Sequence, residues 1–265
     1  MSKKIKSKIL VLGDILLDRY WFGDFIKISS EAPVPVISIN SFDDRPGGAG
    51  NVAMNVKSLG GKVDLMSIVG KDETFNTLKF ILKKNKINFF PIIDKKFITP
   101  LKVRVISKNQ QITRADFEKN NYVKKNINIT NFLNKKIKNY EILVLPDYAK
   151  GTLNNIKNII KIANNHNIPI LIDPKDSDFS KYANSFLITP NFEEFINVVG
   201  KVNSENDLLD KAYNLIKTYN ISNLLITRGK QGMTLISAKQ KPFNISSTAK
   251  DVFDVTGAGD TVLAT

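Results

Sequence analysis

Residues 251–265 read DVFDVTGAGDTVLAT, in which two glycines flank an alanine and an aspartate follows at once. Gly257 and Gly259 have no side chain to shield their backbone N–H groups. If a helix begins here, those groups point outward at the positive end of its dipole, which suits the charge on a phosphoryl group in transfer. Asp260 would lie in the first turn, where a carboxylate can accept a proton from an attacking hydroxyl. A plain glycine-rich turn explains Gly-Ala-Gly-Asp alone about as well, but the longer string from Asp254 is far more specific.

Length and composition indicate a globular protein with a sizeable core. The chain has 265 residues, of which 42% are hydrophobic, and a mean hydropathy of −0.15. It contains no run of apolar residues long enough to span a membrane, and the basic N-terminus lacks the apolar core of a signal peptide. Cysteine is absent, which excludes disulfides and thiolate metal sites. We expect one domain over residues 1–265, in a cytoplasmic protein that does not bind membranes.

The net charge of +14 raises the question of nucleic-acid binding. The lysines are spread along the chain among many asparagines and isoleucines, and no dense basic block with interleaved aromatic residues occurs. This distribution favours a solvated surface over a nucleic-acid interface. A positive field would still help to recruit anionic substrates such as nucleotides and sugar phosphates.

Short apolar runs alternate with helical patterns along most of the chain. This alternation predicts an α/β fold with a doubly wound, mostly parallel sheet flanked by helices. The expected strands are residues 8–13, 63–69, 87–93, 141–145, 169–172, 186–188 and 224–227, and the expected helices are 52–60, 73–84, 153–164 and 205–219. Residues 233–236 and 243–245 are expected to form a closing antiparallel pair.

Two other segments predict a small β lid. Pro33 and Pro35 forbid a central strand, so residues 32–42 are expected to form an edge strand. Residues 100–117 show alternation on both sides of a polar turn, which is typical of a hairpin. In such a lid Arg104 and Arg114 could face a substrate phosphate, although exposed surface arginines explain them equally well.

Polar residues near the N-terminus could bind a sugar. Asp14 and Asp18 are expected in the loop after the first strand, beyond its carboxyl end, where ligands bind in open α/β sheets. Their carboxylates could accept hydrogen bonds from sugar hydroxyls, or they could be ordinary turn and surface residues. Gly47 and Gly48 precede a helix and would let a ligand approach the backbone closely, and Asn51 could both donate and accept.

Taken together, these segments resemble the ribokinase-like carbohydrate kinases, also called the phosphofructokinase-B type, over nearly the whole chain. The segments that carry the resemblance, in the family's order, are residues 13–18, 47–51, 191–194, 227–232 and 254–260. Five further segments resemble the branch of the family that phosphorylates the C1 hydroxyl of D-glycero-β-D-manno-heptose 7-phosphate, for ADP-heptose and the lipopolysaccharide core. They are residues 14–21, 28–35, 107–111, 147–151 and 173–175.

The resemblance implies ATP and Mg²⁺ as cofactors and assigns a role to each matching position. Asp260 would be the catalytic base, and Gly257, Ala258 and Gly259 would form the anion hole. The residues expected along ATP are Asn191, Phe192, Glu193, Glu194, Thr227, Gly229, Gly232, Asp254 and Thr256, with Glu194 helping to place Mg²⁺. The residues expected to hold the sugar phosphate are Asp14, Asp18, Gly47, Gly48, Asn51, Arg104 and Lys175, and Arg45 is a further candidate for a phosphate contact. The family also implies a homodimer through the lid.

The end of the chain departs from the family pattern. The chain stops at Thr265, whereas kinase domains of this family continue for several helices. We therefore expect a C-terminally incomplete domain, in which the helix that bears Asp260 is barely one turn long and marginal by itself. Two alternatives remain open: another ribokinase-type sugar or nucleoside kinase, and a non-catalytic truncated remnant.

Overall fold

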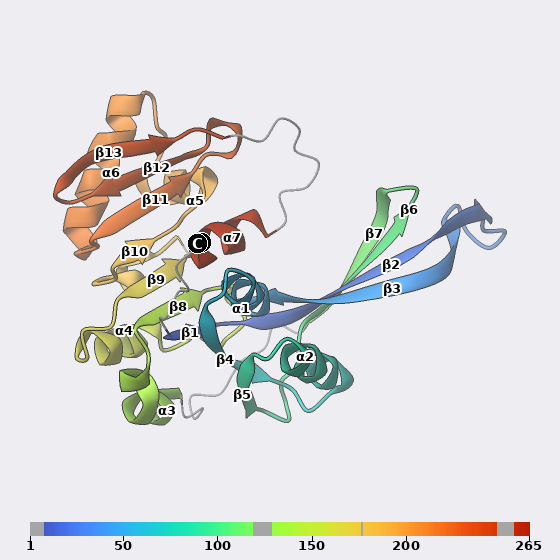
Figure 1. Cartoon of the computed structure of the whole chain (residues 1–265). Helices are drawn as coiled ribbons and strands as arrows, with labels where there is room; N and C mark the ends of the chain where they lie inside the picture. The colour runs from blue at the N-terminus through green and yellow to red at the C-terminus, as the bar shows by residue number, and fades with distance from the viewer. Residues whose placement is uncertain (1–7, 119–128, 176, 248–256) are drawn as a thin grey trace.

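The computed structural model describes residues 8–118, 129–175, 177–247 and 257–265, and a nine-stranded sheet forms its centre (Figure 1). Seven neighbouring strands are parallel, and two strands at one edge are antiparallel. In spatial order the strands are β13 (Gln240–Ile245), β12 (Met233–Ser237), β11 (Asn223–Thr227), β10 (Leu187–Ile188), β9 (Ile170–Asp173), β8 (Ile142–Pro146), β1 (Lys8–Leu12), β4 (Lys62–Val69) and β5 (Asn88–Ile93). The predicted mostly parallel sheet and its closing antiparallel pair are confirmed.

The central strands are apolar on both faces because helices cover both faces of the sheet. In β1, Leu10 and Leu12 join one core and Val11 joins the other, in keeping with the two-residue period of a strand. One face is covered by α1 (Ala49–Ser58), α2 (Glu73–Lys84) and α7 (Ala258–Ala264). The other is covered by α3 (Ile129–Lys136), α4 (Ile156–Asn164), α5 (Phe192–Val199) and α6 (Glu205–Tyr219).

A second sheet extends away from the first and contains four strands in the order β3 (Pro35–Gly48), β2 (Ile15–Ile28), β6 (Leu101–Ser107) and β7 (Gln110–Phe117) (Figure 1). The hairpin of β6 and β7 is confirmed. The prediction that Asp18 lies in a loop is wrong, because β2 begins at Ile15 and pairs with both β3 and β6. Gly47 and Gly48 are also not in a free turn, since they pair with Leu16 and Ile15 at the end of β3.

Several helix boundaries differ from the sequence prediction. Helix α1 begins at Ala49 rather than at residue 52, directly after the strand, and α4 begins at Ile156 rather than at 153. Helix α7 has seven residues, so the expected single turn was too short. Its Leu263 is buried against the cluster that includes Val52 and Val56 of α1, and tertiary packing thus supports a helix that would be marginal alone. Within the described ranges, no helix is long and apolar enough to cross a membrane.

The order of the strands places the site. After β1 the chain proceeds to β4 and β5 on one side and later returns to β8 on the other side of β1. Strands β1 and β8 therefore form a topological switch point, and ligands bind at the carboxyl ends of such strands. Asp14 follows β1 and Tyr148 follows β8 at this point, and the N-terminal turn of α7 lies beside them.

Candidate active site

Asp260 lies in the first turn of α7 and is buried, with 5% of its surface exposed. Asn51 Nδ2 donates a hydrogen bond to Asp260 Oδ2 over 2.7 Å, and Tyr148 Oη donates to Oδ1 over 2.8 Å. A Cβ atom on Gly257 would lie 2.8 Å from Asn51 Nδ2, so glycine at this position lets Asn51 reach the carboxylate. The carboxylate is thus held by two donors from separate parts of the chain.

Burial is the main cause that raises the pKa of Asp260, and the negative charge of Asp18 adds to it. The hydrogen bonds from Asn51 and Tyr148 act in the opposite direction, because they stabilise the ionised carboxylate. A carboxylate with a raised pKa and unshared lone pairs is suited to accept a proton.

The second sheet brings Asp18, Gly47 and Arg104 to the same place. Arg104 Nη1 forms an ion pair and hydrogen bond with Asp18 Oδ1, and both side chains are largely buried. A Cβ atom on Gly47 would lie 2.2 Å from Asp18 Oδ2, so the glycine leaves room for this carboxylate. These three predicted sugar-binding residues therefore lie together, and the ion pair of Asp18 and Arg104 is their polar part.

Cross-strand pairing places three arginines on the face of the second sheet that carries Asp18 and Tyr20. Arg45 is opposite Asp18, Arg104 is opposite Tyr20, and Arg114 is opposite Arg104. The guanidinium groups of Arg45 and Arg104 lie 4.7 and 5.2 Å from the centre of the Tyr20 ring. Arg45 and Arg114 have exposed side chains that are also paired with aspartates, at positions 43 and 116. Among the described residues, the ion pair of Arg104 is with a predicted site residue, Asp18, whereas those of Arg45 and Arg114 are not.

Asp14 has a clear structural role. Its carboxylate accepts hydrogen bonds from the backbone N–H groups of Tyr148, Lys150 and Thr152 over 3.2, 2.9 and 2.8 Å. Burial raises the pKa of Asp14, and these backbone donors oppose the shift. Asp14 therefore holds the loop after β8 against the end of β1, and a contact with a sugar stays a prediction.

The predicted nucleotide residues lie at the carboxyl ends of the strands beyond β9. Asn191 caps α5 in a capping box, in which its side chain accepts from Glu194 N and Glu194 Oε2 accepts from Asn191 N. Asn191 also forms a parallel bridge with Thr227 at the end of β11. Glu194 Oε1 lies 3.8 Å from Lys175 Nζ, so these two residues are neighbours.

The other nucleotide candidates are near these residues in the chain. Phe192 and Glu193 are in the first turn of α5, and Gly229 and Gly232 belong to the turn between β11 and β12. Asp254 and Thr256 lie outside the described residues.

The sequence assigned no role to two residues that the structure places in the site. One is Tyr148, and the other is Asp173, the last residue of β9. A Cβ atom on Gly259 would lie 4.0 Å from Asp173 Oδ2. Burial, with the charges of Asp260 and Glu194, raises the pKa of Asp173 to about 7. Asp173 ends a buried strand and Tyr148 lies two residues after one, as Asp14 does, so the rule that selected Asp14 could have found them.

The donor set fits Mg²⁺ held mainly by a nucleotide. Among the residues that the structure describes, no group of three or more His, Cys, Asp or Glu side chains could hold a metal ion. Mg²⁺ usually keeps several waters and takes one or two carboxylates together with substrate phosphates. Glu194 Oε1 is not used by the capping box and could supply such a contact.

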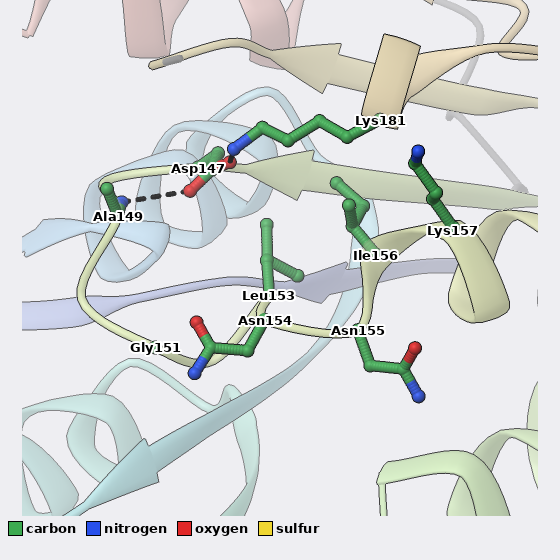
Figure 2. A pocket seen from close by; sticks show the side chains of 9 residues that line it. All are labelled: Asp147, Ala149, Gly151, Leu153, Asn154, Asn155, Ile156, Lys157 and Lys181. Carbon is green, nitrogen blue, oxygen red and sulfur yellow. Dashed lines mark hydrogen bonds and ion pairs between the residues drawn. The ribbon is translucent and has the colours of Figure 1, made fainter. Parts of the chain in front are cut away.

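A cavity of about 340 Å³ lies beside the loop after β8 and is lined by no predicted site residue (Figure 2). At its rim Lys181 Nζ lies 3.1 Å from Asp147 Oδ2, and Ala149 N donates to Asp147 Oδ1 over 2.9 Å. Tyr182 Oη also donates to Asp147 Oδ2, over 2.7 Å. These contacts, together with those of Asp14, fix the loop that carries Tyr148.

Comparison with known proteins gives a consistent family match. The family model described as "pfkB family carbohydrate kinase" matches residues 6–265. The bifunctional protein HldE of Haemophilus influenzae is 46% identical over 264 residues, covering 98% of this chain and 54% of the relative. The bifunctional protein HldE of Blochmanniella floridana is 47% identical over 259 residues, with the same coverage of 98% and 54%. The chain thus spans about half the length of the curated relatives it matches.

Solved structures agree on the fold. Phosphofructokinase-2 from Escherichia coli, in its tetrameric inhibited form, aligns with a TM-score of 0.77 at 18% identity, covering 98% of this chain and 86% of that chain. Arabidopsis thaliana ribokinase, complexed with ribose and ATP, aligns with a TM-score of 0.72 at 16% identity, covering 98% and 84%. At these identities the likeness concerns the ribokinase-like fold alone.

Proposed function

Because the chain belongs to the pfkB family of carbohydrate kinases, we propose that it transfers a phosphoryl group from ATP to the C1 hydroxyl of D-glycero-β-D-manno-heptose 7-phosphate. That the chain is a kinase follows from the family and from its relatives. The heptose substrate is supported by 46% identity to HldE proteins over 98% of the chain, together with the sequence segments that resemble the heptose branch. We place the reaction in the cytoplasm, where ATP is available.

The observation that carries the proposal is the position of Asp260. Its carboxylate is buried at the start of α7 and interacts electrostatically both with Asp18, the ion-pair partner of Arg104, and with Asp173 at the end of β9. An acceptor hydroxyl on the Asp18 side would meet the base, and a nucleotide on the Asp173 side would meet the predicted nucleotide residues. This arrangement matches phosphoryl transfer, in which catalysis is mainly positioning and charge stabilisation.

In the proposed mechanism Asp260 accepts the proton of the sugar hydroxyl as that oxygen attacks. Asn51 holds one oxygen of the base, and the backbone N–H groups of Gly257, Ala258 and Gly259 stabilise the negative charge that develops. The sugar is held by Asp18, Gly47 and Gly48. The region around Asp14, whose carboxylate accepts hydrogen bonds from backbone N–H groups, also holds the sugar. Arg104 and Lys175 neutralise phosphate charge.

Bound ATP with Mg²⁺ would supply the phosphoryl group, and the chain's own contribution is to orient it. Residues 191–194 and Thr227, with Gly229 and Gly232, are proposed to line the nucleotide, and Glu194 to hold a water or Mg²⁺ beside its phosphates. The second sheet is proposed to act as a lid that excludes water and limits hydrolysis of ATP.

The test measures ADP release from ATP and Mg²⁺ with three acceptors: D-glycero-β-D-manno-heptose 7-phosphate, fructose 6-phosphate and ribose. We expect turnover that depends on the heptose phosphate and is lost in the Asp260→Asn variant. A preference for fructose 6-phosphate or ribose would refute the heptose assignment. Absence of turnover with every sugar, from a sample that is folded by circular dichroism, would refute kinase activity for this chain.

We also propose that the chain forms a homodimer through the lid sheet. Large hydrophobic side chains on β2 and β3 are exposed, among them Phe25 at 47%, Ile28 at 56% and Phe42 at 66%. An exposed apolar surface on an extended sheet is typical of an interaction site. Sedimentation of the protein and of a Phe42→Lys variant tests this: we expect a dimer that the variant dissociates, and a monomeric parent protein would exclude it.

A further inference from the structure

Tyr148 is the second hydrogen-bond donor to Asp260, and the proposed function gives it no part. Its phenol donates to Oδ1 over 2.8 Å, while Asn51 donates to Oδ2 over 2.7 Å. The two donors come from the loop after β8 and from α1. With one donor on each oxygen, the carboxylate has a defined orientation, and each oxygen keeps a lone pair for an incoming proton.

The position of Tyr148 is itself fixed by buried contacts. Its backbone N–H donates to Asp14 Oδ2 over 3.2 Å, and Asp14 anchors Lys150 and Thr152 of the same loop. A Cβ atom on Gly48 would lie 3.5 Å from the Tyr148 ring, so the ring packs against the end of β3. The phenol therefore reaches Asp260 from a loop that is held by Asp14, which follows β1, and by Gly48 at the end of β3.

We propose that Tyr148 is a positioning residue for phosphoryl transfer, which orients Asp260 and keeps it ionised so that it can take the proton of the acceptor hydroxyl. The inference rests on the proposed role of Asp260 as base. In the step, the sugar oxygen forms a bond to the γ-phosphorus of ATP as the bond to the bridging oxygen breaks, ADP leaves with that electron pair, and the proton goes to Asp260.

The charges around the base make this donor important. Asp18 on β2 and Asp173 at the end of β9 are both carboxylates near Asp260, and Glu194 of α5 acts on Asp173 in turn. Arg104 is paired with Asp18 and Lys175 is a neighbour of Glu194, so these cations are partly neutralised. Burial and like charge raise the pKa of Asp260, and the phenol opposes them, so its removal raises that pKa further.

The experiment compares Tyr148→Phe with a matched control, Tyr140→Phe. Tyr140 is a buried tyrosine whose hydroxyl donates to a carboxylate, Asp64 Oδ2, over 2.7 Å, at the opposite end of the sheet. Each variant removes one phenol–carboxylate hydrogen bond, which is partly buried for Tyr148 and buried for Tyr140. We measure kcat, the KM for ATP and the pH dependence of kcat/KM for the sugar phosphate.

For Tyr148→Phe we expect kcat to fall about tenfold, because a hydrogen bond to an ionised group is lost, with the KM for ATP unchanged. The acidic limb of the kcat/KM profile should move to higher pH. Tyr140→Phe should leave the pH profile unchanged. A Tyr148→Phe variant whose rate falls by the same factor at every pH would show a structural effect only and would overturn the proposal.

A second measurement does not need turnover. The carboxyl carbon of Asp260 is followed by nuclear magnetic resonance during a pH titration of protein labelled at aspartate, with the signal assigned by its loss in Asp260→Asn. We expect a higher midpoint in Tyr148→Phe than in the parent protein, and an unchanged midpoint refutes the inference. An inactive parent protein would refute the proposed function, whereas the midpoint would still decide the effect of Tyr148 on Asp260.

Discussion

Replacing Asp173 with asparagine should stabilise the fold at alkaline pH and leave it nearly unchanged at acidic pH. Burial and the charges of Asp260 and Glu194 raise the pKa of Asp173 from its usual 3.8 to about 7 in the folded protein. Between these values the folded chain binds a proton at Asp173 that the unfolded chain has released. The free energy of unfolding of the parent protein therefore falls as pH rises through this interval.

The size of the effect follows from the pKa difference. A shift of about 3 units corresponds to about 4 kcal/mol, which is an upper limit because Asp173 keeps some exposure to solvent. We therefore expect Asp173→Asn to gain about 2–4 kcal/mol relative to the parent protein at about pH 8.5, and little at about pH 4.5. The asparagine cannot ionise, so it avoids the cost of a buried charge beside Asp260.

Urea unfolding of both proteins across this pH range gives the two free energies, and titrating groups that do not interact with Asp173 cancel in the difference. Glu141→Gln, which removes an exposed carboxylate just before β8, serves as the control for the loss of a carboxylate outside the site. If Asp173→Asn differs from the parent protein by the same amount at both ends of the pH range, the account of Asp173 as a carboxylate with a raised pKa is refuted.

Three further substitutions test other parts of the site. Asp260→Asn should lower kcat by about 10²–10⁴-fold while ATP binding, measured by calorimetry, persists; a nearly normal rate would exclude Asp260 as base. Gly47→Ala places a methyl group 2.2 Å from Asp18 Oδ2. This variant should raise the KM for the sugar several-fold without changing the KM for ATP. Equal changes in both KM values would contradict the assignment of Gly47 to the sugar site. Arg104→Met leaves the carboxylate of Asp18 unpaired and should lower the free energy of unfolding by about 3 kcal/mol; the double variant with Asp18→Asn should recover part of this loss, and additivity would argue against the ion pair.

Local pattern was enough to predict the strands of the large sheet. Runs such as residues 63–69 and 224–227 are short and largely apolar, as is typical of strands covered by helices on both faces of a sheet. Strand β2 was missed because Ile15–Ile28 changes from a buried to an exposed pattern along its length, and it is a strand because β3 and β6 pair with it. Helix α5 was missed although its capping box, Asn191 with Glu194, is a local signal.

In the candidate site, too, a local pattern predicts some residues and tertiary contacts alone determine others. The sequence by itself marked Asp260 and its glycines, because a glycine-rich helix start followed by an acidic residue is a local pattern, and α7 does begin there. Only the tertiary structure brought Tyr148 and Asn51 to its carboxylate, since these partners are 112 and 209 residues away along the chain. They meet because β8 returns beside β1 and because α1 and α7 pack on the same face of the sheet. A hydrogen bond between distant residues depends on how the strands are ordered, and no local pattern of residues carries that information.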